Sequence, residues 1–137
     1  MPTHRILLIE DDALEAALAL RTLRQIDPTL EVTRLGDGAH FLEFCRDATN
    51  DLRRYSVAIM DLNMPRVDGH GVLQSFRERG DRPPFPIVLF SSSEDKEDVD
   101  RAYELGGAAF VNKPVSPAKY RAAMEHIISF WVRTNRR

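Results

Sequence analysis

Short apolar runs recur along the chain, and longer stretches with helical spacing separate them. The most apolar runs lie at 6–9, 57–60 and 87–90, and weaker ones lie at 30–35 and 108–111. Unbroken apolar runs of this length are typical of strands that are covered on both faces of a sheet. The pattern therefore predicts five strands.

Apolar residues at three- and four-residue spacing predict helices in the intervals. The first helix is expected after Asp12, a suitable N-cap. Its predicted apolar residues are Ala13, Ala16, Ala17, Leu20 and Leu23. Further helices are expected near 39–46, 70–79 and 94–105, whereas the polar segment 47–54 predicts a loop.

The last predicted helix has the clearest pattern. Ser116 is a suitable N-cap, and Pro117 suits the first turn because its missing N–H would be unpaired there in any case. The apolar stripe that follows consists of Tyr120, Ala123, Met124, Ile127, Ile128 and Trp131. Five strands that alternate with five helices predict an α/β fold with a parallel sheet, because right-handed crossovers join parallel strands.

Asp61 directly follows the apolar run 57–60, and the chain must then form a loop. Pro65 lacks the N–H that a central strand needs, and Gly69 permits backbone angles that other residues resist. Asp61 is thus expected at the carboxyl end of a strand, which is the edge where open parallel sheets bind ligands. Taken alone, an acid at such a position is weak evidence for a site, because it is more often a loop acid that caps the next helix.

Chemically capable side chains also follow three of the other runs. Glu10 and Asp11 come after the first run, Ser91 after the fourth and Lys113 after the fifth. Because the carboxyl ends of parallel strands lie at one edge of a sheet, these side chains should meet Asp61 there. This coincidence favours a functional site over helix capping.

Three carboxylates at one edge repel one another unless a cation neutralises them. Oxygen ligands suit a hard divalent ion such as Mg²⁺. One carboxylate can then act as nucleophile toward a phosphoryl group and form an aspartyl phosphate. Lys113 would neutralise charge on the phosphoryl oxygens, and Ser91 would donate a hydrogen bond to one of them.

Four motifs in order carry a resemblance to a known family. They are Ile-Glu-Asp-Asp at 9–12, Met-Asp-Leu-Asn-Met-Pro at 60–65 with Gly69, Leu-Phe-Ser-Ser at 89–92 and Asn-Lys-Pro at 112–114. With them the chain resembles the receiver domain of two-component response regulators over about residues 4–130. The resemblance implies a doubly wound, flavodoxin-like sheet of strand order 2-1-3-4-5 with five helices.

The resemblance also implies roles for individual residues. Asp61 would be the phosphoacceptor, and Mg²⁺ would be held by Asp11, Asp61 and the backbone carbonyl of Asn63, with Glu10 helping through water. Lys113 and Ser91 keep the catalytic roles given above.

Two further roles come with the family. The peptide between Lys113 and Pro114 would be cis, which only an X-Pro bond reaches at low cost. Phe110 would be the switch aromatic, which swings inward when Ser91 moves toward the phosphoryl group.

A narrower resemblance concerns small regulators that are paired with bacterial phytochrome histidine kinases. It rests on the Asp-Leu-Asn-Met-Pro loop, the Ser-Ser-Ser-Glu-Asp run at 91–95, Ala-Tyr at 102–103 and Ile-Ser-Phe-Trp at 128–131. It implies a sensor histidine kinase, here a bacteriophytochrome, as the partner.

Composition bounds the remaining possibilities. With 137 residues, 43% of them hydrophobic and 29% charged, we expect a single receiver domain over 1–137 and no effector domain. The net charge of −2 argues against nucleic acid as partner. No segment resembles a signal peptide or reaches membrane-spanning length, and Cys45 is the single cysteine, so a cytoplasmic location is expected.

The expected function is a stand-alone phosphorylation switch. A kinase phosphohistidine would donate to Asp61, and the acyl phosphate would change the surface of the fourth helix, fifth strand and fifth helix. The same face would form a homodimer. Apart from accepting the phosphoryl group and slowly losing it, no enzymatic activity is expected.

Other functions stay open at this stage. One alternative is a phosphate shuttle that passes the group on to a histidine phosphotransfer protein, and another is a receiver-like interaction module that works without phosphate. A phosphohydrolase is disfavoured, because such enzymes usually carry a second acid two residues after the nucleophile and Asn63 stands there.

Overall fold

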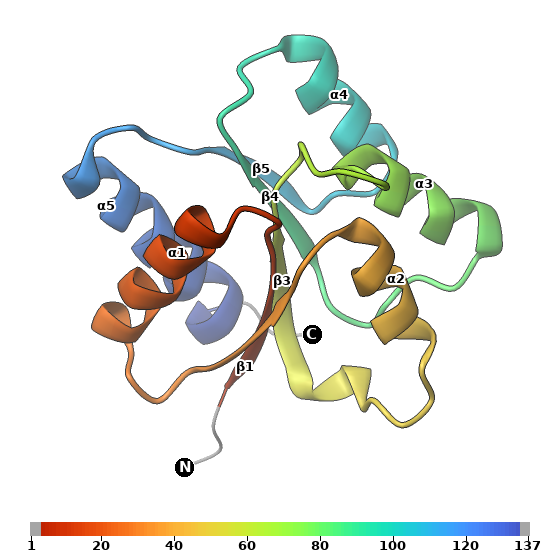
Figure 1. The fold of residues 1–137 in the computed structure, drawn as a ribbon, viewed down its shortest axis with the longest axis horizontal. Helices are drawn as coiled ribbons and strands as arrows, with labels where there is room; N and C mark the ends of the chain where they lie inside the picture. Colours follow the sequence, from red (N-terminus) through yellow and green to blue (C-terminus); the bar gives the residue numbers. More distant parts are fainter. Residues whose placement is uncertain (1–3, 135–137) are drawn as a thin grey trace.

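The computed structural model describes residues 4–134 and contains the predicted parallel sheet (Figure 1). The strands are β1 (Arg5–Ile9), β2 (Glu31–Leu35), β3 (Tyr55–Met60), β4 (Ile87–Ser91) and β5 (Ala109–Asn112). The α-helices are α1 (Ala13–Ile26), α2 (Gly38–Arg46), α3 (Gly69–Arg79), α4 (Lys96–Glu104) and α5 (Pro117–Ile128). A 3₁₀ helix (Leu52–Arg54) precedes β3, and a π-helix (Ser129–Thr134) follows α5.

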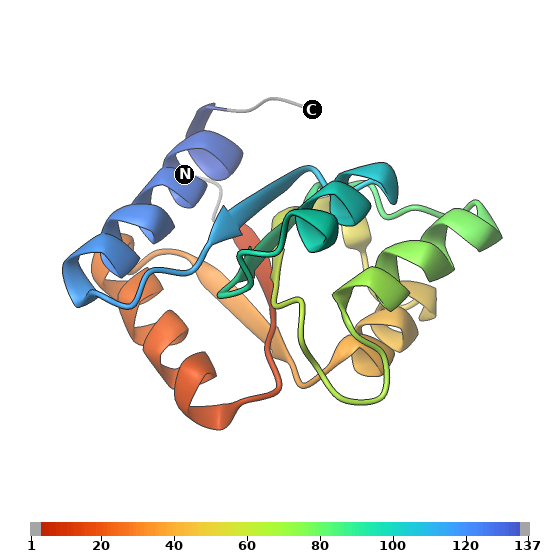
Figure 2. The same cartoon turned by 90° about the horizontal axis from the view of Figure 1, so that it is seen from above.

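The strand order β2-β1-β3-β4-β5 confirms the expected flavodoxin-like topology. Figure 2 shows α1 and α5 on one face of the sheet and α2, α3 and α4 on the other. Successive residues of a strand point to opposite faces, so β1 supplies both cores. Leu7 and Ile9 pack with α2, α3 and α4, whereas Ile6 and Leu8 pack with α1 and α5.

Each α-helix begins at a residue whose side-chain oxygen accepts a hydrogen bond from a backbone N–H of the first turn. These N-caps are Asp12, Asp37, Asp68, Asp95 and Ser116. The caps at Asp12 and Ser116 confirm the sequence predictions. All five caps lie in the loops that follow the carboxyl ends of the strands, and none of them is one of the predicted site acids Glu10, Asp11 and Asp61.

The predicted apolar face of α1 is partly wrong. Ala13 and Ala17 are exposed, and the buried positions are Ala16, Ala19 and Leu23 together with Thr22, whose hydroxyl donates to the Leu18 carbonyl. Alanine occurs on both faces of this helix, so apolar spacing could not locate the face that meets the sheet.

Two segment boundaries also differ from the prediction. Residues 52–54 form a 3₁₀ turn capped by Asp51, although the polar composition of 47–54 predicted a loop throughout. The fourth helix begins at Lys96 and not at residue 94, because Asp95 caps it and accepts a hydrogen bond from the Glu97 N–H.

The C-terminal segment passes from α5 into a π-helical turn. Tyr120, Met124, Ile127 and Ile128 are buried, which confirms most of the predicted stripe. Val132 of the π-helix is buried and packs in the same core.

Tyr103 of α4 covers part of the outer edge of β5, which is the edge strand of the sheet. The backbone N–H of Phe110 donates to the Tyr103 hydroxyl at 3.0 Å, although half of the Tyr103 side chain is exposed. An edge strand presents N–H groups that have no neighbouring strand to pair with. At Phe110 the Tyr103 hydroxyl accepts the hydrogen bond that a neighbouring strand would otherwise accept.

Candidate functional site

The carboxyl ends of β1 and β3 bring the predicted acids together. One carboxylate oxygen of each of Glu10, Asp11 and Asp61 lies within 4.8 Å of the others. Glu10 is almost fully buried, Asp61 is half-buried and Asp11 is exposed. The sequence prediction of an acidic cluster at this edge is therefore realised in the fold.

Backbone hydrogen bonds fix the position of Asp61. Its N–H donates to the Ile9 carbonyl at 3.1 Å, which extends the pairing of β3 with β1 by one residue. Its carboxylate accepts from the Leu62 N–H at 2.8 Å, and the Gly69 N–H closes the loop by donating to the Leu62 carbonyl at 2.7 Å. The carboxylate is thus held at the strand end and faces the cluster.

The loop from Asp61 to Gly69 depends on close backbone contact. A Cβ atom on Gly69 would lie 3.0 Å from the Leu62 Cα, tighter than ordinary contacts allow. A side chain at position 69 would therefore crowd the backbone of Leu62, which is a reason for glycine here in addition to the backbone freedom that the loop needs.

Arg34 of β2 holds the other two acids, a role that the sequence did not reveal. Its guanidinium donates to the Glu10 carbonyl at 3.0 Å and to the Asp11 carbonyl at 3.2 Å. Arg34 occurs in a modest strand without a motif, so only the register of β2 beside β1 brings it here.

Lys113 enters the cluster from the end of β5. Its Nζ lies 3.3 Å from Glu10 Oε1 and 3.3 Å from Glu15 Oε1, and it lies over the Phe90 ring at 5.6 Å from the centroid. The Lys113 N–H also donates to the Ser91 carbonyl at 2.8 Å, so β5 and β4 stay paired up to this point. Glu15 was not among the predicted site residues.

Burial and charge shift the titration of this cluster. Burial raises the pKa of Glu10 to about 7, with Lys113 opposing the shift and Asp61 adding to it. Burial also raises the pKa of Asp61, again against the effect of Lys113. Burial lowers the pKa of Lys113, but Asp61, Glu10 and Glu15 together outweigh it and raise that pKa above its ordinary value.

The donor set fits a hard divalent cation. Three carboxylate oxygens converge, and burial raises the pKa of Glu10 and of Asp61 although Lys113 opposes the shift. Oxygen ligands from one or two carboxylates with room for water suit Mg²⁺. The participation of the Asn63 backbone carbonyl stays a prediction.

Ser91 lies at the end of β4 and is fully buried. Its Oγ accepts from the Ser93 N–H at 3.3 Å, and the Ser93 hydroxyl donates to Asp98 Oδ2 at 2.7 Å. The Asp98 carbonyl in turn bonds the ring Nε2 of buried His70 at 2.9 Å. The loop after Ser91 is therefore tied to α3 and α4 through Ser93, Asp98 and His70.

The expected cis peptide at Pro114 is wrong. Among residues 4–134 the structure has no cis peptide bond, so the bond between Lys113 and Pro114 is trans. Trans is the lower-energy isomer of an X-Pro bond by about 0.5–1 kcal/mol, and Lys113 reaches the acids in that form. Phe110 is half-buried, and its part in switching stays a prediction.

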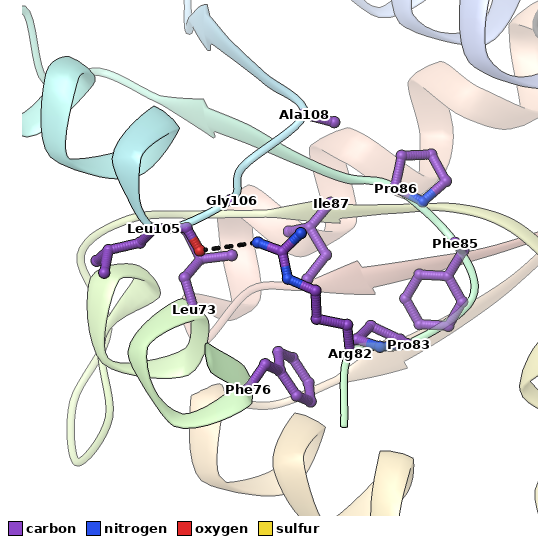
Figure 3. A pocket seen from close by; sticks show the side chains of 10 residues that line it. All are labelled: Leu73, Phe76, Arg82, Pro83, Phe85, Pro86, Ile87, Leu105, Gly106 and Ala108. Atoms are coloured by element: carbon purple, nitrogen blue, oxygen red, sulfur yellow. Dashed lines mark hydrogen bonds between the residues drawn. The ribbon is translucent and has the colours of Figure 1, made fainter. Parts of the chain in front are cut away.

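A separate cavity of about 220 Å³ lies at the opposite end of the sheet (Figure 3). It is lined by apolar residues of α3 and of the segment before β4, among them Leu73, Phe76 and Phe85. Arg82 reaches across it and donates to the Leu105 carbonyl at 3.2 Å. None of the predicted site residues lines this cavity.

The fold and the site define a flavodoxin-like α/β protein with an acidic, lysine-containing centre at the carboxyl edge of its sheet. Residues 6–125 match the family described as response regulator receiver domain. The chain belongs to this family, as the motifs predicted.

The chain is similar in sequence to two regulators over nearly its whole length. It is 30% identical over 132 residues to a probable methanogenesis regulatory protein, FilR2, of Methanothrix harundinacea, covering 96% of this chain and 85% of that one. It is 27% identical over 135 residues to response regulator Rcp1 of Synechocystis, covering 97% and 92%.

Solved structures show the same likeness. The Mn²⁺-bound form of Rcp1 superposes with a TM-score of 0.83 at 27% identity, covering 97% of each chain. A phosphorylated cyanobacterial phytochrome response regulator, RcpA, also superposes with a TM-score of 0.83, covering 97% and 96%, but its 24% identity shows the fold alone. Within residues 4–134, moreover, every helix is too short or too polar to cross a lipid bilayer.

Proposed function

We propose that the chain is a phosphorylation switch that accepts a phosphoryl group on Asp61 from a sensor histidine kinase. The observation that carries the proposal is the meeting of Asp61 with Glu10, Asp11 and Lys113 at one edge of the sheet. Membership of the receiver family supports it. A kinase in the cytoplasm would be the natural donor for this chain.

In the proposed reaction a carboxylate oxygen of Asp61 attacks the phosphorus of a phosphohistidine. The new O–P bond forms as the N–P bond of the donor breaks, and the electron pair of that bond stays on the imidazole. The hydrogen bond from the Leu62 N–H to Oδ1 fixes the orientation of this carboxylate at the strand end.

Two side chains of the site would stabilise the transferred group. Only 11% of the Lys113 side chain is exposed. Water therefore screens the attraction between its charge and the phosphoryl oxygens only weakly. Ser91 already lies at the end of β4 and would exchange its contact with the Ser93 N–H for a hydrogen bond to one phosphoryl oxygen.

When bound, Mg²⁺ would neutralise charge on the phosphoryl oxygens during transfer. The ligands would be Asp11, Asp61 and the Asn63 carbonyl, with Glu10 completing the acidic set. The Mn²⁺-bound form of Rcp1 supports a divalent ion in such a site.

Apolar side chains beside the site suit the docking of the kinase. Leu14 is 83% exposed in the first turn of α1, and Val115 is fully exposed directly after Lys113 and Pro114. Leu18 and Val115 border a hollow of about 510 Å³ between α1 and α5. Exposed apolar groups around a shared hollow are typical of a protein interface. The motifs at 61–65, 91–95, 102–103 and 128–131, which resemble the phytochrome-paired regulators, make a phytochrome kinase the first partner to test.

The proposed output surface comprises α4, β5 and α5, and it would also form a homodimer. Tyr103 of α4 and Phe130 after α5 are half-exposed aromatic residues near this face. Sedimentation at increasing concentration, with and without phosphorylation, would test the dimer. A monomer at every concentration in both states would refute it.

The central experiment is intact mass after incubation with acetyl phosphate and Mg²⁺. We expect wild type to gain a single phosphoryl group only when Mg²⁺ is present. Asp61→Asn should gain none, whereas Asp100→Asn, which removes an exposed aspartate of α4, should behave as wild type. A wild-type chain without an adduct would mean that it works as an interaction module without phosphate.

Onward transfer distinguishes the switch from a relay shuttle. Labelled phosphate on Asp61 should decay to inorganic phosphate when a histidine phosphotransfer protein is added. Rapid appearance of the label on that protein would instead favour the shuttle.

A further inference from the structure

Lys113 has two carboxylate partners, and only one of them belongs to the proposed metal site. Glu10 lies at the end of β1, whereas Glu15 lies in the first turn of α1. Both carboxylates lie 3.3 Å from the same Nζ atom. The two partners therefore share a single ammonium group.

We propose that Glu15 is a positioning residue that holds Lys113 in the unphosphorylated state and competes for it with the incoming phosphoryl group. The proposal rests on the proposed function, because it concerns the lysine that would contact the phosphoryl oxygens. It assigns to Glu15 a control over how readily Asp61 is phosphorylated.

The geometry allows Glu15 to release Lys113 with little disturbance. Its backbone is fixed, since the Glu15 N–H donates to the Asp12 carboxylate at 3.0 Å. Its side chain is 46% exposed, whereas those of Glu10 and Lys113 are 5% and 11% exposed. On losing the lysine, the Glu15 carboxylate can turn to water, but Glu10 cannot.

Lys113 is confined on its other side. The centroid of the buried Phe90 ring lies 5.6 Å from Nζ on the side of the core. On phosphorylation, the Lys113 ammonium would therefore move along the sheet edge, away from Glu15 and toward Asp61.

This exchange should affect phosphorylation of Asp61 and hydrolysis of the phosphoaspartate differently. Lys113 must leave Glu15 before it can stabilise phosphoryl transfer to Asp61, so the Glu15 ion pair opposes that step. Hydrolysis begins after the exchange has taken place, and Glu15 then has no lysine to lose. Removing the Glu15 charge should hence speed phosphorylation and leave dephosphorylation unchanged.

The test compares Glu15→Gln with wild type, using acetyl phosphate at saturating Mg²⁺ and intact mass as the readout. We expect the rate constant of phosphorylation to rise roughly two- to fivefold, the effect of losing a half-exposed ion pair. The dephosphorylation rate should not change. The matched control is Glu97→Gln, which removes an exposed glutamate from the first turn of α4 and should leave both rates unchanged.

A double variant shows whether Glu15 acts through Lys113. Phosphorylation of Lys113→Gln is expected to be slow and is followed over hours. Adding Glu15→Gln to this variant should leave its phosphorylation rate unchanged. An equal acceleration there would mean that Glu15 merely repels the anionic donor, which would overturn the proposal. An unchanged or lower rate in Glu15→Gln alone would also overturn it, whereas a wild type without any adduct would instead refute phosphorylation of Asp61.

Discussion

At the scale of single residues, Arg66 is the strained point of the loop that follows Asp61. Its φ of +67° lies in the left-handed region, and no other non-glycine residue in 4–134 has a positive φ. Its guanidinium pairs with Asp37 Oδ2 at 2.6 Å. Asp37 also caps α2, and the hydrogen bond from the His40 N–H, with that from Arg66, lowers the pKa of its carboxyl group.

Arg66 offers a matched pair of substitutions. Arg66→Gly and Arg66→Ala both lose the ion pair with Asp37, but only alanine keeps the strained backbone. We expect Arg66→Gly to be more stable than Arg66→Ala by about 1 kcal/mol, the ordinary cost of a left-handed non-glycine residue. Urea unfolding of both variants measures the difference, and equal stabilities would show that the loop can relax.

The main site residues could be predicted because each follows the end of an apolar run. Asp61, Glu10, Ser91 and Lys113 were all located in this way, and the fold brings them to one edge. Glu15 could not be predicted as a partner of Lys113, because it lies within a helix and resembles an ordinary first-turn acid. The cis isomer at Pro114 was expected from the family resemblance alone, and the trans bond in the structure contradicts it.

At the scale of elements, the C-terminal end of α4 is fixed by arginines from outside the helix. Arg77 of α3 donates to the Glu104 carbonyl at 2.6 Å, and Arg82 donates to the Leu105 carbonyl. These are carbonyls that a helix end leaves without partners. Gly106 follows with a φ of +103°, and Arg82 lies against its open side (Figure 3).

Gly106→Ala should destabilise the protein by roughly 1–3 kcal/mol, because a side chain strains the positive φ of this position. The Arg82 guanidinium would also have to move aside and so lose its hydrogen bond to the Leu105 carbonyl. Gly36→Ala is the control, since its Cβ would meet nothing within 4 Å. Thermal unfolding of both variants tests this. Equal melting temperatures would contradict a fixed end for α4.

Element types were largely predictable, whereas their faces and ends were not. Apolar runs located all five strands, and caps such as Ser116 located helix starts. The π-helix at 129–134 escaped prediction because its apolar residues, Trp131 and Val132, also continue a helical pattern. The hydrogen bond from the Thr134 hydroxyl to the Ser129 carbonyl, at 2.8 Å, becomes visible only in the structure.

At the scale of the whole molecule, the acidic centre should make stability depend on pH. The pKa of Glu10 is raised by burial from its ordinary value of 4.5 to about 7. Between these pH values the folded protein keeps a proton that the unfolded chain has released. The free energy of unfolding of the metal-free protein should therefore fall as the pH rises through this interval.

Chemical unfolding at several pH values measures this fall. Glu10→Gln should reduce it, and the difference between the two proteins isolates the contribution of Glu10. Mg²⁺ should also reduce the fall in wild type, because a cation stabilises the ionised cluster. A slope that Glu10→Gln leaves unchanged would contradict the burial of a protonated Glu10.

The hydrogen bond from the Phe110 N–H to Tyr103 has a consequence for colloidal behaviour. An open sheet edge is a template on which a second chain can add a strand, and such pairing leads to aggregates. The Tyr103 hydroxyl blocks this template at the strand that carries the predicted switch aromatic. A movement of Tyr103 that breaks this hydrogen bond would leave the Phe110 N–H of the edge strand open to pairing with a second chain.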